Sequence, residues 1–92
     1  MDWDKLKTFH AAAQAGSLTR AAEMLGLSQS AVSRQIAALE DDLGVTLFHR
    51  HARGLIPTEP GNLLYEAARE IHGKVAVAEA RVDQAATSVS RA

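Results

Sequence analysis

The 92-residue sequence predicts a mainly α-helical fold that ends in one long helix. Three observations lead to this prediction. Residues 17–43 hold two short helical patterns separated by a turn, residues 45–57 hold two short strand patterns, and residues 64–89 repeat apolar side chains every three or four positions. Together they predict a winged helix-turn-helix, made of three helices and a two-stranded wing, followed by a long dimerisation helix.

The first helix is expected at about residues 4–15. Leu6 and Phe9 recur at helical spacing, and Gly16 follows as a stop signal. This helix would close the core over the helical pair that follows it. Trp3 and Phe9 are interpreted as residues of the core or its edge, because large aromatic side chains are most often buried.

Two cap signals and a glycine define the helix-turn-helix. The hydroxyl of Ser17 can accept hydrogen bonds from the free amides of a helix that runs to Leu25. Gly26 can adopt the left-handed conformation that ends a helix, and Ser28 offers the next cap. The small pair of residues 21–22 lets the two helices cross closely.

The second helix of this pair has two different sides. Four apolar residues at steps of four, three and four form the side that faces a core: Val32, Ile36, Leu39 and Leu43. The outer side carries small and polar residues: Gln29, Ser30, Ser33, Arg34 and Ala37. Small side chains admit a helix to the major groove, where Gln and Arg can pair with adenine and guanine edges. A merely solvated helix surface would look similar, so the spacing alone leaves both interpretations open.

A tight hairpin follows the helical pair. Residues 45–50 and 55–57 have strand character and flank the sequence His51-Ala52-Arg53-Gly54. Next to a helix-turn-helix, such a hairpin forms a wing. An arginine at a narrow tip suits the minor groove of DNA, where the negative potential is concentrated, so Arg53 is expected to contact DNA.

The long helix is expected to begin near Glu59, after a cap at Thr58, with Pro60 in its first turn. Its apolar residues follow coiled-coil spacing: Leu64, Ala68, Ile71, Val75, Ala78, Val82, Ala85 and Val89. A chain of this size cannot cover the whole seam, so a second copy should. We expect a homodimer through Leu64, Ala68, Ile71, Val75, Ala78 and Val82, with a DNA-binding domain at residues 1–58 and the dimerisation helix at 59–92.

Charge and composition restrict the possible partners. The net charge is −1, but residues 29–39 and 46–58 contain arginines and no acid. Double-stranded DNA is the expected partner, with few phosphate contacts per subunit and an affinity that depends on dimerisation. The sequence has no cysteine and no apolar run of the roughly 20 residues that a membrane span needs. We therefore expect a cytoplasmic protein that does not bind membranes and needs no cofactor.

Catalysis and metal binding are not expected. Serine, histidine and aspartate are present, but no pattern forms a nucleophile turn or an oxyanion site. His49 and His51 alternate along a strand and could share a metal, although no third ligand is near them in the sequence. His10 and His72 are interpreted as isolated helix residues.

The sequence resembles the N-terminal DNA-binding domain of the LysR-type bacterial transcriptional regulators over nearly its whole length. The resemblance rests on five segments of the chain: residues 9–22, 27–36, 39–44, 47–50 and 55–58. It implies that Gln29, Ser30, Ser33 and Arg34 read the major groove and that Arg53 reaches the minor groove or its phosphates. The full set of expected DNA-contacting residues is Ser17, Thr19, Ser28, Gln29, Ser30, Ser33, Arg34, Arg50 and Arg53.

The resemblance also implies features outside this chain. Members of the family carry a C-terminal domain of two α/β lobes that binds a small inducer, and the full-length proteins often form tetramers. The sequence ends at Ala92, just past the long helix, so we expect an excised fragment that stops at a dimer. Two departures from the family are Ser30, where proline is common, and Pro60-Gly61, where Ala-Gly is common.

Two alternatives stay open at this stage. The chain could be a helical protein-interaction module that uses only its coiled-coil helix, although this leaves the acid-free helix side and Arg53 unexplained. The direction of helix pairing is also open. Lys74 and Glu79 and the valines of the seam favour a parallel pair, whereas the resemblance implies an antiparallel one.

Overall fold

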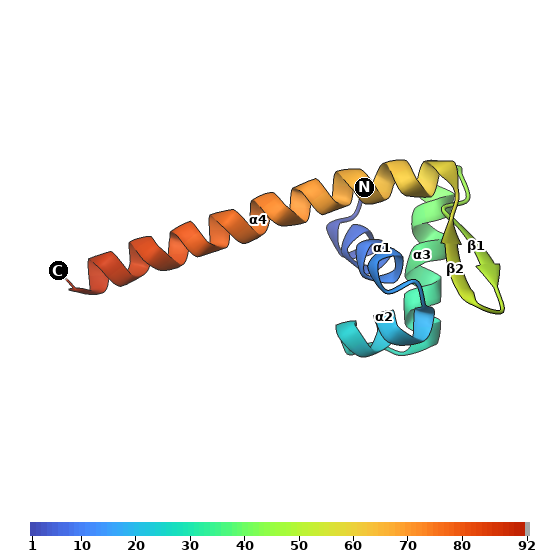
Figure 1. The fold of residues 1–92 in the computed structure, drawn as a ribbon, viewed down its shortest axis with the longest axis horizontal. Coiled ribbons are helices and arrows are strands. Elements are labelled where there is room, and N and C mark those ends of the chain that lie inside the picture. Colours follow the sequence, from blue (N-terminus) through green and yellow to red (C-terminus); the bar gives the residue numbers. More distant parts are fainter. Residues whose placement is uncertain (92) are drawn as a thin grey trace.

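The computed structural model describes the backbone of residues 1–91 and the side chains of residues 1–87. The elements are α1 (Trp3–Ala15), α2 (Leu18–Leu25), α3 (Gln29–Leu43), β1 (Phe48–His51), β2 (Gly54–Pro57) and α4 (Glu59–Arg91). The molecule measures 55 × 24 × 21 Å, because α4 extends far beyond the head formed by the other elements (Figure 1). The mainly helical winged architecture predicted from the sequence is confirmed. The side chain of Val89, the last residue of the predicted seam, lies outside the described part.

The predicted caps set the ends of α2 and α3. The hydroxyl of Ser17 accepts from the amide of Arg20, and that of Ser28 accepts from the amide of Ala31. Between the helices, Gly26 has φ of 66°, a left-handed conformation that a side chain would strain. The turn therefore follows from three residues whose chemistry is visible in the sequence.

A small hydrophobic core joins the three short helices to the start of the wing. Its largest fully buried side chains are Phe9, Val32, Ile36, Leu39 and Leu47. The close crossing predicted at Ala21 and Ala22 is confirmed, since both are buried in this core. Leu43, predicted on the core side of α3, is 40% exposed, and it is the last residue of the helix.

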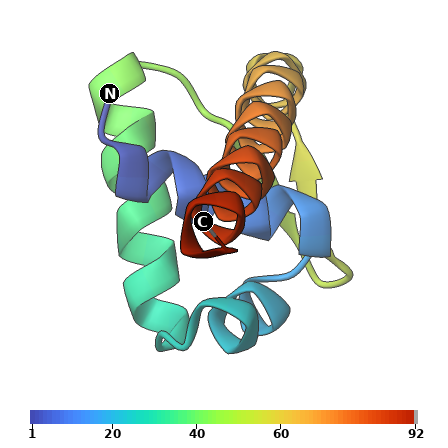
Figure 2. The same cartoon turned by 90° about the vertical axis from the view of Figure 1, so that its left-hand side faces the viewer.

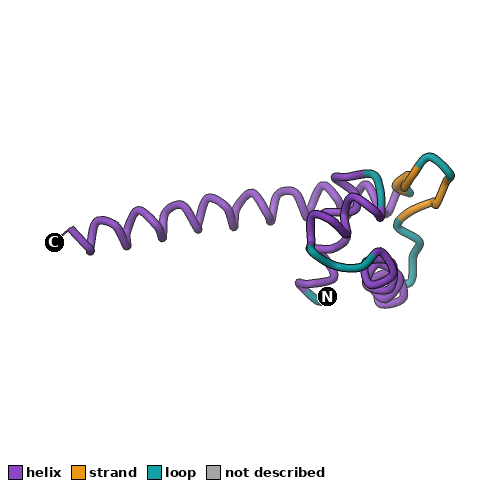
Figure 3. The backbone as a smooth tube through the Cα atoms, turned by 90° about the horizontal axis from the view of Figure 1, so that it is seen from below, coloured by secondary structure: helices purple, strands orange, loops and turns teal. Residues whose placement is uncertain are grey.

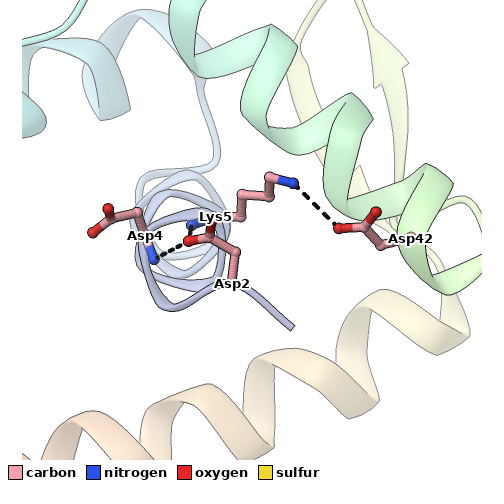
Figure 4. A network of polar contacts seen from close by, with 4 residues as sticks. All are labelled: Asp2, Asp4, Lys5 and Asp42. Carbon is pink, nitrogen blue, oxygen red and sulfur yellow. Dashed lines mark hydrogen bonds and ion pairs between the residues drawn. The ribbon is translucent and has the colours of Figure 1, made fainter.

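Polar contacts fix α1 at its N-terminal end (Figure 4). The carboxylate of Asp2 accepts from the amides of Asp4 and Lys5, which caps the helix. The ammonium of Lys5 lies 3.3 Å from a carboxylate oxygen of Asp42 at the far end of α3. This ion pair is partly exposed, so it orients the two helices and adds little stability.

The wing is shorter than predicted at its start. Strand β1 begins at Phe48 and not near residue 45, because the backbone of Leu47 is engaged elsewhere. Its amide donates to a carboxylate oxygen of Glu40 over 2.7 Å, and its carbonyl accepts from the amide of Thr58 over 3.0 Å. The two strands pair antiparallel, with Arg50 opposite Leu55. In Figure 3 the strands lie at the opposite end of the molecule from the C-terminus.

The wing is attached to the corner between α1 and α2. The amide of Leu55 donates to the carbonyl of Gly16 over 3.1 Å. Gly54 has φ of 127°, and a Cβ at this position would lie only 2.4 Å from the same carbonyl oxygen. Glycine is therefore required at Gly54 for both its backbone conformation and its close approach.

Helix α4 has two parts with different surroundings. Its first turns cross the head beside α1, as the view along the helix shows (Figure 2), and contribute Gly61, Leu64, Tyr65 and Ala68 to the packing. From Gly73 to Thr87 the side chains are exposed on every side. The hydrophobic core therefore extends across the expected boundary between residues 1–58 and 59–92.

This packing corrects one part of the predicted dimer seam. Ala68 is fully buried within the chain, so it has no surface left for a partner subunit to cover, whereas Leu64 is only partly buried against the same core. The heptad pattern identifies which side of the helix is apolar, but it does not say what covers that side. The uncovered part of the stripe begins at Ile71.

A stack of four aromatic rings joins α1 to α4. The ring centroids are 5.2 Å apart for Trp3 and His72, 4.2 Å for His72 and His10, and 5.5 Å for His10 and Tyr65. The two histidines, which belong to different helices, thus lie against each other. Burial lowers the pKa of His10 below its ordinary value, and the neighbouring His72 lowers that pKa further. Since Nδ1 of His72 lies 2.8 Å from the carbonyl of Ala68, Nδ1 carries the hydrogen and donates it.

Candidate nucleic-acid interface

The outer side of α3 presents the polar residues that the sequence placed there. Gln29, Ser30 and Arg34 are exposed, and Ser33 is half-buried. The hydroxyl of Thr19, on α2, lies 3.4 Å from the side-chain oxygen of Gln29 and donates to it. Gln29 therefore keeps its two amide N–H groups for an external partner.

Ser17 and Ser28 lie at the N-terminal ends of α2 and α3. Their hydroxyl oxygens accept from backbone amides in the caps, so their O–H groups are the part left to donate outward. The hydroxyl of Ser28 also lies 3.3 Å from that of Ser30. Helix N-termini carry partial positive charge, and hydroxyls placed there are suited to phosphate oxygens.

The wing lies beside these helix ends and encloses a groove with them. The groove is lined by Ser17, Leu18, Thr19, Gln29, Arg50, His51, Ala52, Arg53, Gly54 and Leu55. An adjoining hollow between α3 and the wing is lined by Leu18, Gln29, Ser30, Ser33 and Arg50. The fold thus brings most of the predicted contact residues, which are far apart in the sequence, to one surface.

Positive charge on this surface is not neutralised within the chain. Neither lining set contains an acidic residue. The two ion pairs found among the described side chains, Lys5 with Asp42 and Arg69 with Glu66, involve none of the lining residues. Arg34, Arg50 and Arg53 therefore keep their full charge for an anionic partner, although the chain as a whole carries a net charge of −1.

One contact across the groove was not predicted. Nη2 of Arg50, on β1, donates to the hydroxyl oxygen of Ser33, on α3, over 2.9 Å. Arg53 is exposed at the tip of the wing and makes no comparable contact with any side chain of residues 1–87. No sequence signal could reveal the Arg50 contact, because it depends on how the wing docks against α3.

The part of α4 beyond the head exposes an apolar stripe. Ile71 and Val75 are each 39% exposed, Val82 is 66% exposed, and Ala78 between them is exposed as well. Val77 is 56% exposed but lies on another side of the helix. A continuous exposed apolar stripe of this kind is typical of a surface that a second helix covers.

The described residues show neither a metal site nor a membrane-spanning helix. In the part of the chain that the structure describes, no three histidine, cysteine or acidic side chains group as metal ligands. His49 and His51 are both exposed on the wing. Likewise, the helices described include none that is long and apolar enough to cross a bilayer.

Comparison with known proteins gives consistent matches. The sequence pattern of the bacterial regulatory helix-turn-helix proteins of the lysR family matches residues 3–62. The HTH-type transcriptional regulator AbaB of Streptomyces antibioticus is 47% identical over 89 residues, which cover 96% of this chain and 30% of that protein. The chain thus spans less than a third of the length of the curated relatives it matches.

Solved structures match in fold as well. The chain is 41% identical to the protein in the crystal structure of a CbnR_DBD-DNA complex, with a TM-score of 0.79, covering 94% of this chain and 99% of that one. For a BenM_DBD/catB site 1 DNA complex the identity is 31% and the TM-score 0.84, covering 94% and 97%.

Proposed function

Because the chain belongs to the lysR family of bacterial regulatory helix-turn-helix proteins, we propose that it binds a specific double-stranded DNA sequence as a homodimer. The relatives are transcriptional regulators, so the proposed role is binding and not catalysis. It would act in the cytoplasm of a bacterial cell, where the DNA lies.

The acid-free groove is the observation that carries this proposal. It combines a helix side able to enter the major groove with two arginines whose charge is not paired. Gln29, Ser30, Ser33 and Arg34 would contact base edges. Ser17, Thr19, Ser28 and Arg50 would contact phosphates, and Arg53 at the wing tip would reach the minor groove or its phosphates.

The dimer would form through the exposed stripe of α4. Its members are Ile71, Val75, Ala78 and Val82. Two heads related by a two-fold axis bind an interrupted inverted repeat, with half-sites about one helical turn, or roughly 34 Å, apart. A module that binds only proteins could use the same stripe, but it would not need the groove.

A selection experiment tests the proposal. The 92-residue chain is incubated with a library of random duplexes, and bound sequences are recovered and sequenced. We expect enrichment of an inverted repeat. Recovery of unrelated sequences without enrichment would contradict sequence-specific binding.

Replacing Arg34 then tests which residue reads the bases. On the selected duplex, Arg34→Ala should weaken binding by about 1 to 3 kcal/mol and relax preference at one position of each half-site, because a bidentate base contact is lost. Arg69→Ala, which removes an exposed arginine of α4, is the matched control. Equal affinity of the Arg34→Ala variant and the parent in a fluorescence titration would exclude this role for Arg34.

A further inference from the structure

The hydrogen bond between Arg50 and Ser33 links the wing directly to the helix that faces the bases. The guanidinium nitrogen lies 2.9 Å from the hydroxyl oxygen. Ser33 is half-buried and Arg50 is exposed, and both line the same hollow. The bond therefore lies at the position that the major-groove edge of a bound duplex would approach.

The chemistry of this pair fixes the direction of hydrogen bonding. A guanidinium has five N–H donors and no acceptor, so Ser33 must accept in this contact. No other hydrogen bond of the Ser33 side chain is found among residues 1–87. Its O–H group is consequently free to donate. The positive charge of Arg50 polarises the hydroxyl, which strengthens it as a donor and weakens it as an acceptor.

The edges of the four bases in the major groove differ in the hydrogen-bond donors and acceptors that they present. Guanine presents two acceptors, adenine presents one acceptor and one donor, thymine presents an acceptor, and cytosine presents only its amino donor. The hydroxyl oxygen of Ser33 keeps one lone pair besides the one that accepts from Arg50, but the adjacent guanidinium charge makes it a poor acceptor. The hydroxyl therefore pairs better with acceptor atoms than with the cytosine amino group. A hydroxyl that can rotate freely would accommodate all four bases.

Resting on the proposed DNA-binding function, we propose that Arg50 is a specificity-positioning residue. Its charge biases Ser33 toward donating a hydrogen bond into the major groove, so that Ser33 favours a base carrying an acceptor over cytosine at one position of each half-site. Arg50 thereby influences sequence preference without touching a base.

The test uses the 92-residue chain and the duplex recovered by selection. The position that Ser33 contacts is found as the one where Ser33→Ala abolishes base preference. Duplexes with each of the four bases at that position are then titrated. The parent chain should bind the preferred base about tenfold more tightly than cytosine, a factor that corresponds to about 1.4 kcal/mol.

In Arg50→Met this ratio should fall to about twofold or less, because without the adjacent positive charge the hydroxyl becomes a better acceptor for the cytosine amino group. Arg53→Met is the matched control: it removes a wing arginine without a contact to Ser33, so affinity should fall on all four duplexes while their ratio stays unchanged. In the double variant Ser33→Ala/Arg50→Met, the ratio should equal that of Ser33→Ala alone.

Three results would overturn the inference. In the first, Arg50→Met loses affinity equally on every duplex, so the ratio between the preferred base and cytosine is unchanged. In the second, Ser33→Ala alters base preference at no position. In the third, the parent chain prefers cytosine at the position that Ser33 contacts. The first would leave Arg50 as a phosphate contact only. Failure of the parent chain to select any sequence would instead contradict the proposed function itself, so the two failures are distinguishable. Circular dichroism melting confirms that each variant is folded.

Discussion

The three arginines of the acid-free surface have different neighbours, and their expected effects on DNA binding differ accordingly. Arg34 projects from α3 and is free to contact a base. Arg50 is tied to Ser33 and can act on both phosphate and base preference. Arg53 is exposed on a narrow tip and is best placed for the DNA backbone or the minor groove. A single residue type would thus serve three purposes in the proposed DNA binding, which the surrounding fold distinguishes.

Replacing Arg53 should change how binding depends on salt. Binding to DNA releases fewer counterions when one phosphate contact is lost. In Arg53→Ala the slope of the logarithm of the association constant against the logarithm of the salt concentration should therefore become shallower by about 0.9 per subunit. Titrations at several salt concentrations measure this slope, with Arg69→Ala as control. A slope equal to that of the parent would mean that the wing tip stays away from DNA.

Much of this surface could be predicted residue by residue from the sequence. Helical spacing alone placed Ser30 and Arg34 on the outer side of α3, since the apolar residues determine the inner side. The contact between Ser33 and Arg50 could not be predicted in this way. The two residues are 17 positions apart in different elements, and only the docking of the wing brings them together.

At the scale of elements, local chemistry set the helix ends and tertiary contacts set the strands. The caps at Ser17 and Ser28 were predictable, because cap residues act on amides two or three positions away. Strand β1 begins later than its composition indicated, since Glu40 captures the amide of Leu47. Strand propensity cannot anticipate such a bond from another element.

The ring stack between α1 and α4 should make stability depend on pH. The pKa of His10 is lowered in the folded chain, so between that value and its unfolded pKa of about 6.5 the unfolded chain binds more protons. Stability should therefore be complete above pH 6.5 and fall as the pH decreases below it. Urea unfolding at a fixed protein concentration, at pH 7.5 and 5.5, measures the difference.

His10→Phe keeps a ring in the stack but removes the titrating group, so it should reduce this difference. His49→Gln, which alters an exposed histidine on the wing, should leave the difference unchanged. Equal pH dependence in His10→Phe and the parent would show that the stack does not cause it.

At the scale of the whole molecule, one apolar stripe on α4 has two uses. Leu64 and Ala68 pack on the head of their own chain, whereas Ile71 and the residues after it are open to a partner. The heptad pattern showed a single apolar stripe, but it could not show at which residue packing on the head ends and the exposed part begins. The structure places the change near residue 71.

Ile71→Asp should dissociate the proposed dimer. Burying an unpaired carboxylate in the seam is costly, and the dimer dissociation constant should rise by a factor on the order of 100. Sedimentation equilibrium measures the constant. Val77→Asp introduces the same charge on another exposed side of α4 and should leave the dimer intact. A dimer that survives Ile71→Asp alone would place the interface elsewhere.

Helix α4 is unbroken, so a change in the angle at which it crosses α1 would move its far end as a rigid body about the ring stack at His10 and His72. The part of α4 from His72 to its end at Arg91 is about 28 Å long at ~1.5 Å per residue, so a tilt of about 7° at the ring stack displaces the far end of the helix by roughly 3.4 Å. The displacement is close to the ~3.4 Å rise of one base pair. A very small change in the angle at which α4 crosses α1 would therefore shift the spacing of the two heads by one base-pair step.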